Sequence, residues 1–195
     1  NLESARAYNG LALISKEISQ TKKAVQLFEK AIRILQRCFG QHHLDLSYSY
    51  NGLGLLYIET ADFPKAQSYL EQALALKKEL LGEKHSESIE ALNNLALIEA
   101  LVENHDDAFQ LYSRSMSIFL ESNASQNLTA ASTYFGMGTV QYSKENYTLA
   151  LDYYKKALDI YLAHYSEDSH IIAVIYNNIA NIYDFKGKAS LALEY

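Results

Sequence analysis

The chain has 195 residues, nearly half of them hydrophobic, and a formal net charge of −6. Acidic and basic residues are interspersed without a basic stripe, so we expect no nucleic-acid partner. No apolar run approaches the ~20 residues of a membrane span, and the single cysteine, Cys38, excludes an internal disulfide. We therefore expect a cytoplasmic protein that does not contact a membrane.

A repeat of 42 residues runs through the whole sequence. Its first anchor is a five-residue motif that starts at Tyr8, Tyr50, Leu92, Tyr134 and Tyr176. Its second anchor is an alanine, found at Ala24, Ala66, Ala108, Ala150 and Ala192. A fixed period in the tens of residues is typical of a solenoid, in which each unit stacks on its neighbours. The repeat predicts an all-α fold, an α-α superhelix of helix-turn-helix units.

In chain order we expect a single array over residues 1–195, with full repeats at about 5–46, 47–88, 89–130 and 131–172 and a partial repeat at 173–195. The first repeat closes at Gly40, where glycine can adopt the left-handed conformation that ends a helix. The second repeat predicts one helix near 44–60 and another near 63–81, ended by Gly82. Asp62 precedes that second helix and is expected to cap it, with Pro64 in its first turn.

The later repeats follow the same plan. Asn104 and Asn146 stand where Asp62 stands, so we expect them to be N-caps as well. The fifth repeat stops within an apolar stripe that contains Leu191, Leu193 and Tyr195. Because solenoids need polar end caps, we expect the natural protein to be longer, and the apolar end would also allow self-association.

Small residues recur inside the helices. Each first helix holds one of Ala12, Gly54, Ala96, Gly138 and Ala180, and each second helix holds the anchoring alanine. Small side chains at both places predict a close approach of the two helices, with aromatic residues filling the space around them.

These anchors resemble the tetratricopeptide repeat along essentially all 195 residues. In the second repeat the pattern of that family is read in Tyr50, Leu53, Gly54, Tyr57, Ala66, Leu70 and Ala73. The unit is longer than the family's usual ~34 residues, and it is most similar to the kinesin light chain class. That similarity rests on Leu81-Gly82-Glu83-Lys84-His85 before Asn93, and on Phe39-Gly40-Gln41-His42-His43 before Asn51. The class usually has proline after the histidine, where this chain has Leu44 and Ser86.

The resemblance implies a protein-interaction module whose first helices line a concave face that binds a partner peptide or protein. Carried onto this sequence, the peptide-binding positions are Arg6, Asn9, Leu13, Lys16, Tyr48, Asn51, Leu55, Asn93, Leu97, Phe135, Thr139, Tyr142, Asn177 and Asn181.

Asparagines recur at one place in this set, although asparagine is a poor helix former. A carboxamide both donates and accepts, so a row of them would hold the backbone of an extended peptide. The alternative is that the asparagines bond to neighbouring helices and fix the stacking.

The charged residues of the implied face restrict the kind of ligand that we expect. Only Arg6 and Lys16 are basic on the implied face, against Glu90 and Asp184. Kinesin light chains bind cargo peptides with acidic flanks, which require a basic groove. We therefore expect a ligand that is apolar or mildly basic rather than acidic.

Catalytic motifs are absent from the sequence. There is no phosphate-binding loop, metal-binding helix motif or nucleophile elbow. His43 and His85 are one repeat apart and would not share a zinc ion easily. We expect no enzyme activity and no cofactor, and the first hypothesis is a scaffold or adaptor. The alternatives are a regulatory or sensory array that controls an attached effector or binds a signal peptide, and a structural spacer.

Overall fold

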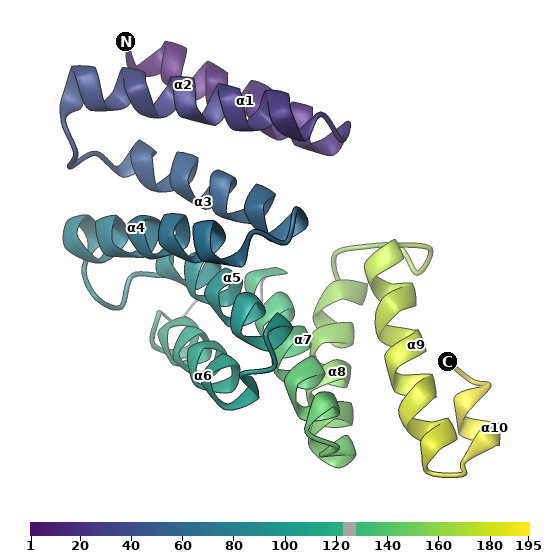
Figure 1. Cartoon of the computed structure of the whole chain (residues 1–195). Coiled ribbons are helices and arrows are strands. Elements are labelled where there is room, and N and C mark those ends of the chain that lie inside the picture. Colours follow the sequence, from purple (N-terminus) through teal and green to yellow (C-terminus); the bar gives the residue numbers. More distant parts are fainter. Residues whose placement is uncertain (123–127) are drawn as a thin grey trace. The chain divides into compact units, whose positions relative to one another are not determined.

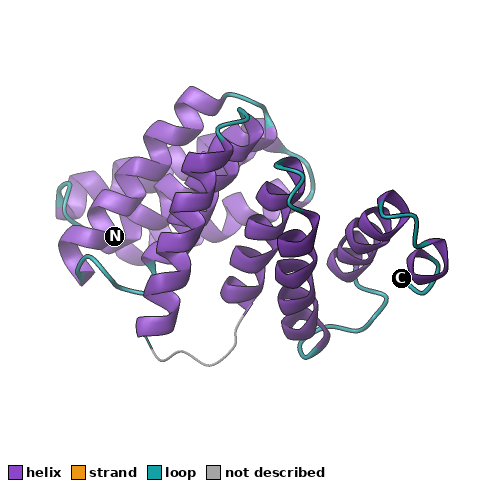
Figure 2. Cartoon of the chain, turned by 90° about the horizontal axis from the view of Figure 1, so that it is seen from below, coloured by secondary structure: helices purple, strands orange, loops and turns teal. Residues whose placement is uncertain are grey.

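The computed structural model describes residues 1–122 and 128–195, and the regular elements within them are all helices (Figures 1 and 2). In order these are α1 (Leu2–Glu17), α2 (Thr21–Phe39), α3 (Leu44–Glu59), α4 (Phe63–Leu81), α5 (Ser88–Leu101), α6 (His105–Glu121), α7 (Leu128–Ser143), α8 (Tyr147–Leu162), α9 (His170–Phe185) and α10 (Ala189–Ala192). Odd-numbered helices are the first helices of successive repeats and even-numbered helices the second. The all-α prediction is confirmed.

The chain forms two compact units, Asn1–Ile98 and Glu99–Tyr195. In the first unit α1 packs on α2, α2 on α3, and α3 on α4. In the second unit α6 packs on α7, α7 on α8, α8 on α9, and α9 on α10. Each unit is thus a stack of helical hairpins in chain order. That residues 1–195 form a single array stays a prediction.

The helix boundaries of the second repeat were predicted correctly, but the side-chain cap of α4 is not repeated at the N-termini of α6 and α8. The Asp62 carboxylate accepts a hydrogen bond from the Lys65 backbone amide and caps α4, as expected. Asn104 and Asn146 occupy the N-cap positions of α6 and α8, but neither side chain caps its helix. That part of the prediction was wrong.

The side-chain amides of the two asparagines instead donate hydrogen bonds to the preceding helix. Asn104 Nδ2 lies 2.8 Å from Glu99 Oε2, and Asn146 Nδ2 lies 2.9 Å from Gln141 Oε1. A carboxamide can donate to the preceding helix in this way, whereas a carboxylate such as Asp62 only accepts.

Two kinds of turn use a positive φ. Gly40 and Gly82 end α2 and α4 with φ of 74° and 100°, but their ψ values of −157° and 160° are extended rather than helical. Almost only glycine tolerates this combination. The left-handed helical conformation that we expected at Gly40 is therefore not the one found there.

Positive φ values near 60° occur instead in the turn inside each hairpin. They recur every 42 residues, at Ser19, Ala61, Glu103, Glu145 and Gly187, with φ of 58°, 58°, 65°, 60° and 69°. Only the last of these is glycine, so the pattern could not be recognised from glycine spacing. A side chain with a Cβ is strained in this conformation.

Replacing Ala61 by glycine should remove that strain. We expect Ala61→Gly to raise the free energy of unfolding by about 1 kcal/mol, measured by urea denaturation. Ala75→Gly is the matched control, because Ala75 is an exposed residue inside α4 and glycine there should cost about 1 kcal/mol. Destabilisation by both changes would contradict a strained turn.

Large side chains of the second helices fill the space above the small residues of the first helices. A Cβ added to Gly52 of α3 would overlap the ring of Phe28 from α2, and one added to Gly54 would overlap Leu70 of α4. In the second unit, Gly136 and Gly138 of α7 have the same relation to Tyr112 and Tyr154. Gly54 and Gly138 thus lie in tight contact with the second helix of their own repeat, through Leu70 and Tyr154. A close approach at the anchoring alanines stays a prediction. At these glycines, a ring or a branched side chain occupies the space that the missing Cβ leaves open.

A methyl group at Gly52 tests this packing. We expect Gly52→Ala to lower the free energy of unfolding by about 1–2 kcal/mol, because the buried Phe28 ring must move. Gly10→Ala is the matched control, since Gly10 has the same place in α1 and nothing within 4 Å of an added Cβ. There the better helix former should stabilise the chain by about 1 kcal/mol. Thermal and urea unfolding measure both variants. If Gly52→Ala and Gly10→Ala changed the free energy of unfolding equally, the packing argument would be contradicted.

The C-terminal stripe packs only in part. The Tyr195 ring lies 5.8 Å from the rings of both Tyr176 and Tyr183 on α9, whereas Leu193 is exposed. Self-association through this end stays a prediction.

Candidate functional site

The candidate site of the first unit is one side of its first helices, which we call the first-helix face. It holds Arg6, Asn9, Leu13 and Lys16 of α1, Tyr48, Asn51 and Leu55 of α3, and Asn93 and Leu97 of α5. Within each helix, consecutive positions of this set are three or four residues apart, so the side chains lie on one side of the helix.

Polar side chains on this face link each first helix to the next one. Each bond or ion pair joins two residues that are 39 to 43 positions apart, or about one repeat. They join Arg6 to Asp45, Asn9 to Ser49, Lys16 to Glu59, Tyr48 to Glu87, and Asn51 to both Glu90 and Asn94. We call this set the polar ladder. It holds α1, α3 and the start of α5 in register.

Asn51 is the most constrained asparagine of the row. Its Nδ2 donates to Glu90 Oε1 at 3.0 Å, and its Oδ1 accepts from Asn94 Nδ2 at 3.1 Å. The residue is only 5% exposed. Both ends of this carboxamide therefore serve the contact between repeats, which is the stacking role left open above.

The other asparagines differ in their surroundings. Asn9 is half-buried and accepts a hydrogen bond from Ser49 Oγ at 2.9 Å, and Asn93 is buried. Asn177 and Asn181 of α9 in the second unit are exposed. A role in binding a ligand thus stays a proposal, and it suits the exposed members of the row best.

Apolar side chains remain open on the same face. Leu13 is 51% exposed and Leu97 is 37% exposed, and Leu55, at the same place in α3, is half-buried. Tyr48 is 44% exposed, and its hydroxyl donates to Glu87 Oε2 at 2.7 Å. These residues offer apolar surface beside fixed carboxylates.

The charges of the face are mostly paired, with carboxylates in excess. Arg6 Nε lies 2.6 Å from Asp45 Oδ2, and Lys16 Nζ lies 3.0 Å from Glu59 Oε1. Burial and the hydrogen bond to Glu87 raise the pKa of Tyr48 to about 12. The phenol therefore stays protonated at neutral pH and remains a donor to Glu87.

Lys77 of α4 also reaches this face, and the sequence analysis did not single it out. It is almost fully buried, its Nζ donates to the Glu87 carbonyl at 2.8 Å, and the Nζ lies 5.3 Å from the centre of the Tyr48 ring. Burial lowers its pKa, against the raising effect of Glu90 and Glu87. Its signal in the sequence is a lysine where the other repeats have Leu35, Phe119 and Tyr161.

The predicted residues of the second unit form a more aromatic surface. The Phe135 ring lies 5.7 Å from that of Tyr154, whose hydroxyl bonds to Thr139 Oγ1 at 3.3 Å. The Tyr142 ring packs edge-on against Tyr147, with 5.7 Å between their centres. Phe135 and Tyr142 are half-buried and Thr139 is exposed.

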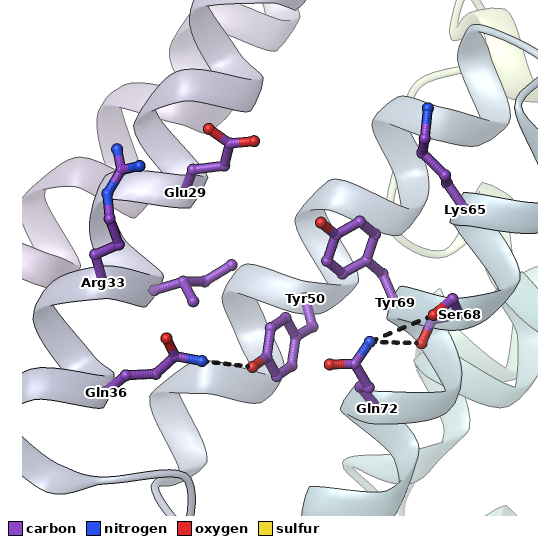
Figure 3. Close-up of a pocket in the computed structure, with 9 residues that line it drawn as sticks. Glu29, Arg33, Gln36, Tyr50, Lys65, Ser68, Tyr69 and Gln72 are labelled. Carbon is purple, nitrogen blue, oxygen red and sulfur yellow. Dashed lines mark hydrogen bonds between the residues drawn. The ribbon is translucent and has the colours of Figure 1, made fainter.

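A groove of about 650 Å³ lies on another side of the first unit, between α2 and α4 (Figure 3). Its lining includes Arg33 and Gln36 of α2, Tyr50 of α3, and Lys65 and Tyr69 of α4. Gln36 donates to the Tyr50 hydroxyl at 3.2 Å. The groove lies between two successive second helices, and the anchor position, which is tyrosine in every repeat except the third, is the sequence signal that could have located it. Its charged groups do not converge on one point, so it indicates no particular chemistry.

Two of the histidines that carry the kinesin light chain resemblance accept a backbone hydrogen bond two residues on, and His43 is the N-cap of α3. His43 Nδ1 accepts from the Asp45 amide at 3.2 Å, and His85 Nδ1 accepts from the Glu87 amide at 3.3 Å. Among residues 1–122 and 128–195, no group of three or more His, Cys, Asp or Glu is placed to hold a metal ion.

Comparison with known proteins identifies the family. One tetratricopeptide repeat model matches residues 3–79, 87–163 and 130–195, and a second such model matches residues 51–119. The chain belongs to the tetratricopeptide repeat family. No curated protein matches it in sequence. The family is one of protein-interaction modules, and its repeats are generally non-catalytic.

Solved structures share the fold of this tetratricopeptide repeat protein at low sequence identity. BtubC (BKLC) from P. vanneervenii is 22% identical, with a TM-score of 0.79 over 99% of this chain and 83% of that one. The TPR-like repeats of a candidate kinesin light chain from Podosopora anserina are 17% identical, with a TM-score of 0.74 over 100% and 92%. The apo form of RapI is 14% identical, with a TM-score of 0.79 over 98% and 67%. These likenesses establish the fold, and at that level they confirm the resemblance to kinesin light chain repeats. In the part of the chain that the structure describes, no helix is long and apolar enough to cross a membrane.

The stacking role of Asn51 is testable by its removal. We expect Asn51→Ala to lower the free energy of unfolding by about 1–2 kcal/mol, because Glu90 and Asn94 both lose a partner. Asn181→Ala is the matched control on an exposed part of α9, where the loss of asparagine should be neutral or slightly stabilising. Urea unfolding measures both, and an unchanged stability of Asn51→Ala would contradict the ladder as a stacking device.

Proposed function

We propose that this protein is a non-catalytic scaffold or adaptor that binds a peptide segment of a partner protein on its first-helix face. The observation that carries the proposal is a row of apolar side chains at one place in three successive repeats, in which Leu13 and Leu97 are exposed and Leu55 is half-buried. Exposed aliphatic side chains in line across several helices can accept the apolar side chains of an extended or helical segment.

The polar ladder supports a rigid rather than an adaptable surface. Its hydrogen bonds fix the helices before a ligand arrives, so little ordering cost remains for binding. The ladder also uses Asn9 and Asn51 for stacking, so the ligand contacts fall mainly to Leu13, Tyr48 and Leu97.

Charge supports a ligand that is apolar or mildly basic. The carboxylates of the ladder are Asp45, Glu59, Glu87 and Glu90, and its cations are Arg6 and Lys16, both held by carboxylates. The buried Lys77 is bound to a backbone carbonyl below the surface. A lysine or arginine of the ligand could pair with Glu87 or Glu90, whereas an acidic segment would meet like charge.

Selection from a displayed library of random peptides tests the proposal. We expect the retained peptides to be enriched in aliphatic and aromatic residues with lysine or arginine, and depleted of aspartate and glutamate. Their affinity should fall by about tenfold or more for the Leu13→Ser, Leu97→Ser double variant, because each serine removes apolar surface from the contact.

The matched control is the Leu80→Ser, Leu149→Ser double variant, which makes the same chemical change at exposed leucines of the second helices α4 and α8. Its affinity should equal that of the unchanged protein, and circular dichroism should show the same helix content for all three. Enrichment of acidic peptides, or an equal loss in the control, would overturn the proposal.

A further inference from the structure

The groove between α2 and α4 continues along α2 toward the start of that helix. It shares Glu29 with a second hollow of about 380 Å³, whose lining includes Thr21 and Val25 of α2 and Tyr57 of α3. Together the two hollows follow α2 from Thr21 to Gln36, a length of about 22 Å at the helical rise of about 1.5 Å per residue. We call them the second-helix groove. Its lining has no residue in common with the first-helix face.

A row of three tyrosine rings lies along this groove. The Tyr69 ring of α4 lies 6.0 Å from that of Tyr50 and 5.7 Å from that of Tyr57, and its plane is within 2° of that of Tyr57. Tyr50 is buried, whereas Tyr57 and Tyr69 are half-buried. Tyr69 reaches from α4 toward α2, beside Tyr50 (Figure 3). The charged groups of the groove do not converge, but its rings form a continuous aromatic surface.

The stacking of repeats does not require this row. In the other repeats the equivalents of Tyr57 are Ser15, Glu99, Gln141 and Tyr183, and those of Tyr69 are Leu27, Leu111, Tyr153 and Tyr195. Rings stand at both positions only in the second and fifth repeats. Since the other repeats stack without the pair, packing alone does not account for Tyr57 and Tyr69.

Hydrogen-bond donors beside the rings have no partner in the part of the chain that the structure describes. Arg33 is exposed and makes no hydrogen bond or ion pair there, and the Tyr69 hydroxyl makes no hydrogen bond there. Burial raises the pKa of Tyr69, so the hydroxyl stays protonated at neutral pH and can donate.

Cations outnumber carboxylates along the groove. Among the described residues of its lining, Lys22, Arg33 and Lys65 are basic and Glu29 alone is acidic. Lys65 Nζ lies 2.6 Å from Asp62 Oδ2, so Lys22 and Arg33 remain for a ligand. The groove therefore favours a ligand that accepts hydrogen bonds and brings no cation.

A proline-rich segment in the polyproline II conformation matches both the rings and the donors. This conformation has no internal hydrogen bonds and proline has no amide N–H, so the backbone of such a segment offers carbonyl acceptors and brings no donor that must be paired. Grooves lined by aromatic side chains bind segments of this kind. At about 3.1 Å per residue, about seven residues would cover the length of the groove.

We propose that the second-helix groove binds a proline-rich segment of a partner protein. The proline rings lie on Tyr57 and Tyr69, and the carbonyls accept from Arg33 and the Tyr69 hydroxyl. Because a proline-rich segment is already extended before it binds, little conformational freedom is lost. The inference does not depend on the proposed function, since the two surfaces have no residue in common.

A labelled peptide of ten prolines tests the proposal. Fluorescence anisotropy of this peptide with the full chain should show saturable binding. The matched control peptide has ten residues of alternating glycine and serine and the same label. It is flexible and carries no rings, so it should show no saturable binding.

A pair of glutamate substitutions on α4 locates the site without disturbing the packing. Ser68→Glu places a carboxylate at an exposed position of the groove, facing the ligand carbonyls, and should weaken the proline peptide at least about tenfold. Gln67→Glu adds the same charge at the neighbouring exposed residue, which does not line the groove, and should leave the affinity unchanged. Circular dichroism should show the same helix content for both.

Substitutions of Tyr69 separate the ring from the hydroxyl. Tyr69→Ala should weaken the peptide at least about tenfold, whereas Tyr69→Phe keeps the ring and should cost only about threefold to tenfold. Tyr165→Ala is the control at an exposed tyrosine of the second unit and should have no effect.

The assignment fails if the proline peptide does not saturate, if the glycine-serine peptide binds equally well, or if Ser68→Glu and Gln67→Glu have the same effect. Loss of the proline peptide in the Leu13→Ser, Leu97→Ser variant, with full affinity in Ser68→Glu, would place it on the first-helix face instead.

Discussion

The stack depends on one recurring contact, in which a large side chain of a second helix fills the space that a missing Cβ leaves open on a first helix. Phe28 over Gly52 joins two repeats, and Leu70 over Gly54 joins the two helices of one repeat. Tyr112 and Tyr154 make the same two contacts with Gly136 and Gly138 in the second unit. Because helix packing leaves few voids, the size of these side chains fixes how closely the backbones approach.

The polar ladder fixes the first helices once the packing contacts have brought them together. Once the first helices are brought together, residues about one repeat apart meet across them, and Asn51 can bond to Glu90 and Asn94 at the same time. Buried polar groups that are fully paired specify one arrangement, since any slip would leave them without partners. The same hydrogen bonds fix how the first helices lie against one another, and this determines which side chains of the first-helix face stay exposed.

Particular residues show how far the sequence could be interpreted. The bounds of α4, the cap at Asp62 and the packing role of Gly54 follow from local chemistry and spacing, and the structure agrees with them. Asn104 has the same place as Asp62, but its side chain bonds to Glu99. Lysine is not a residue type that indicates burial, and only its place in the repeat, shared with the buried Leu35, Phe119 and Tyr161, marks Lys77 as buried. Its contacts with Tyr48 and the Glu87 carbonyl could not be predicted.

The sequence by itself determined the class of fold, the length of the unit and the sides of the helices that pack, because a constant period of 42 residues requires equivalent contacts in every repeat. Only the tertiary structure decided the partner of each polar side chain. Asn9, Asn51 and Asn177 look alike in the sequence, yet they are half-buried, buried and exposed. A carboxamide can bond in several directions, and the neighbouring helix determines which of them is used.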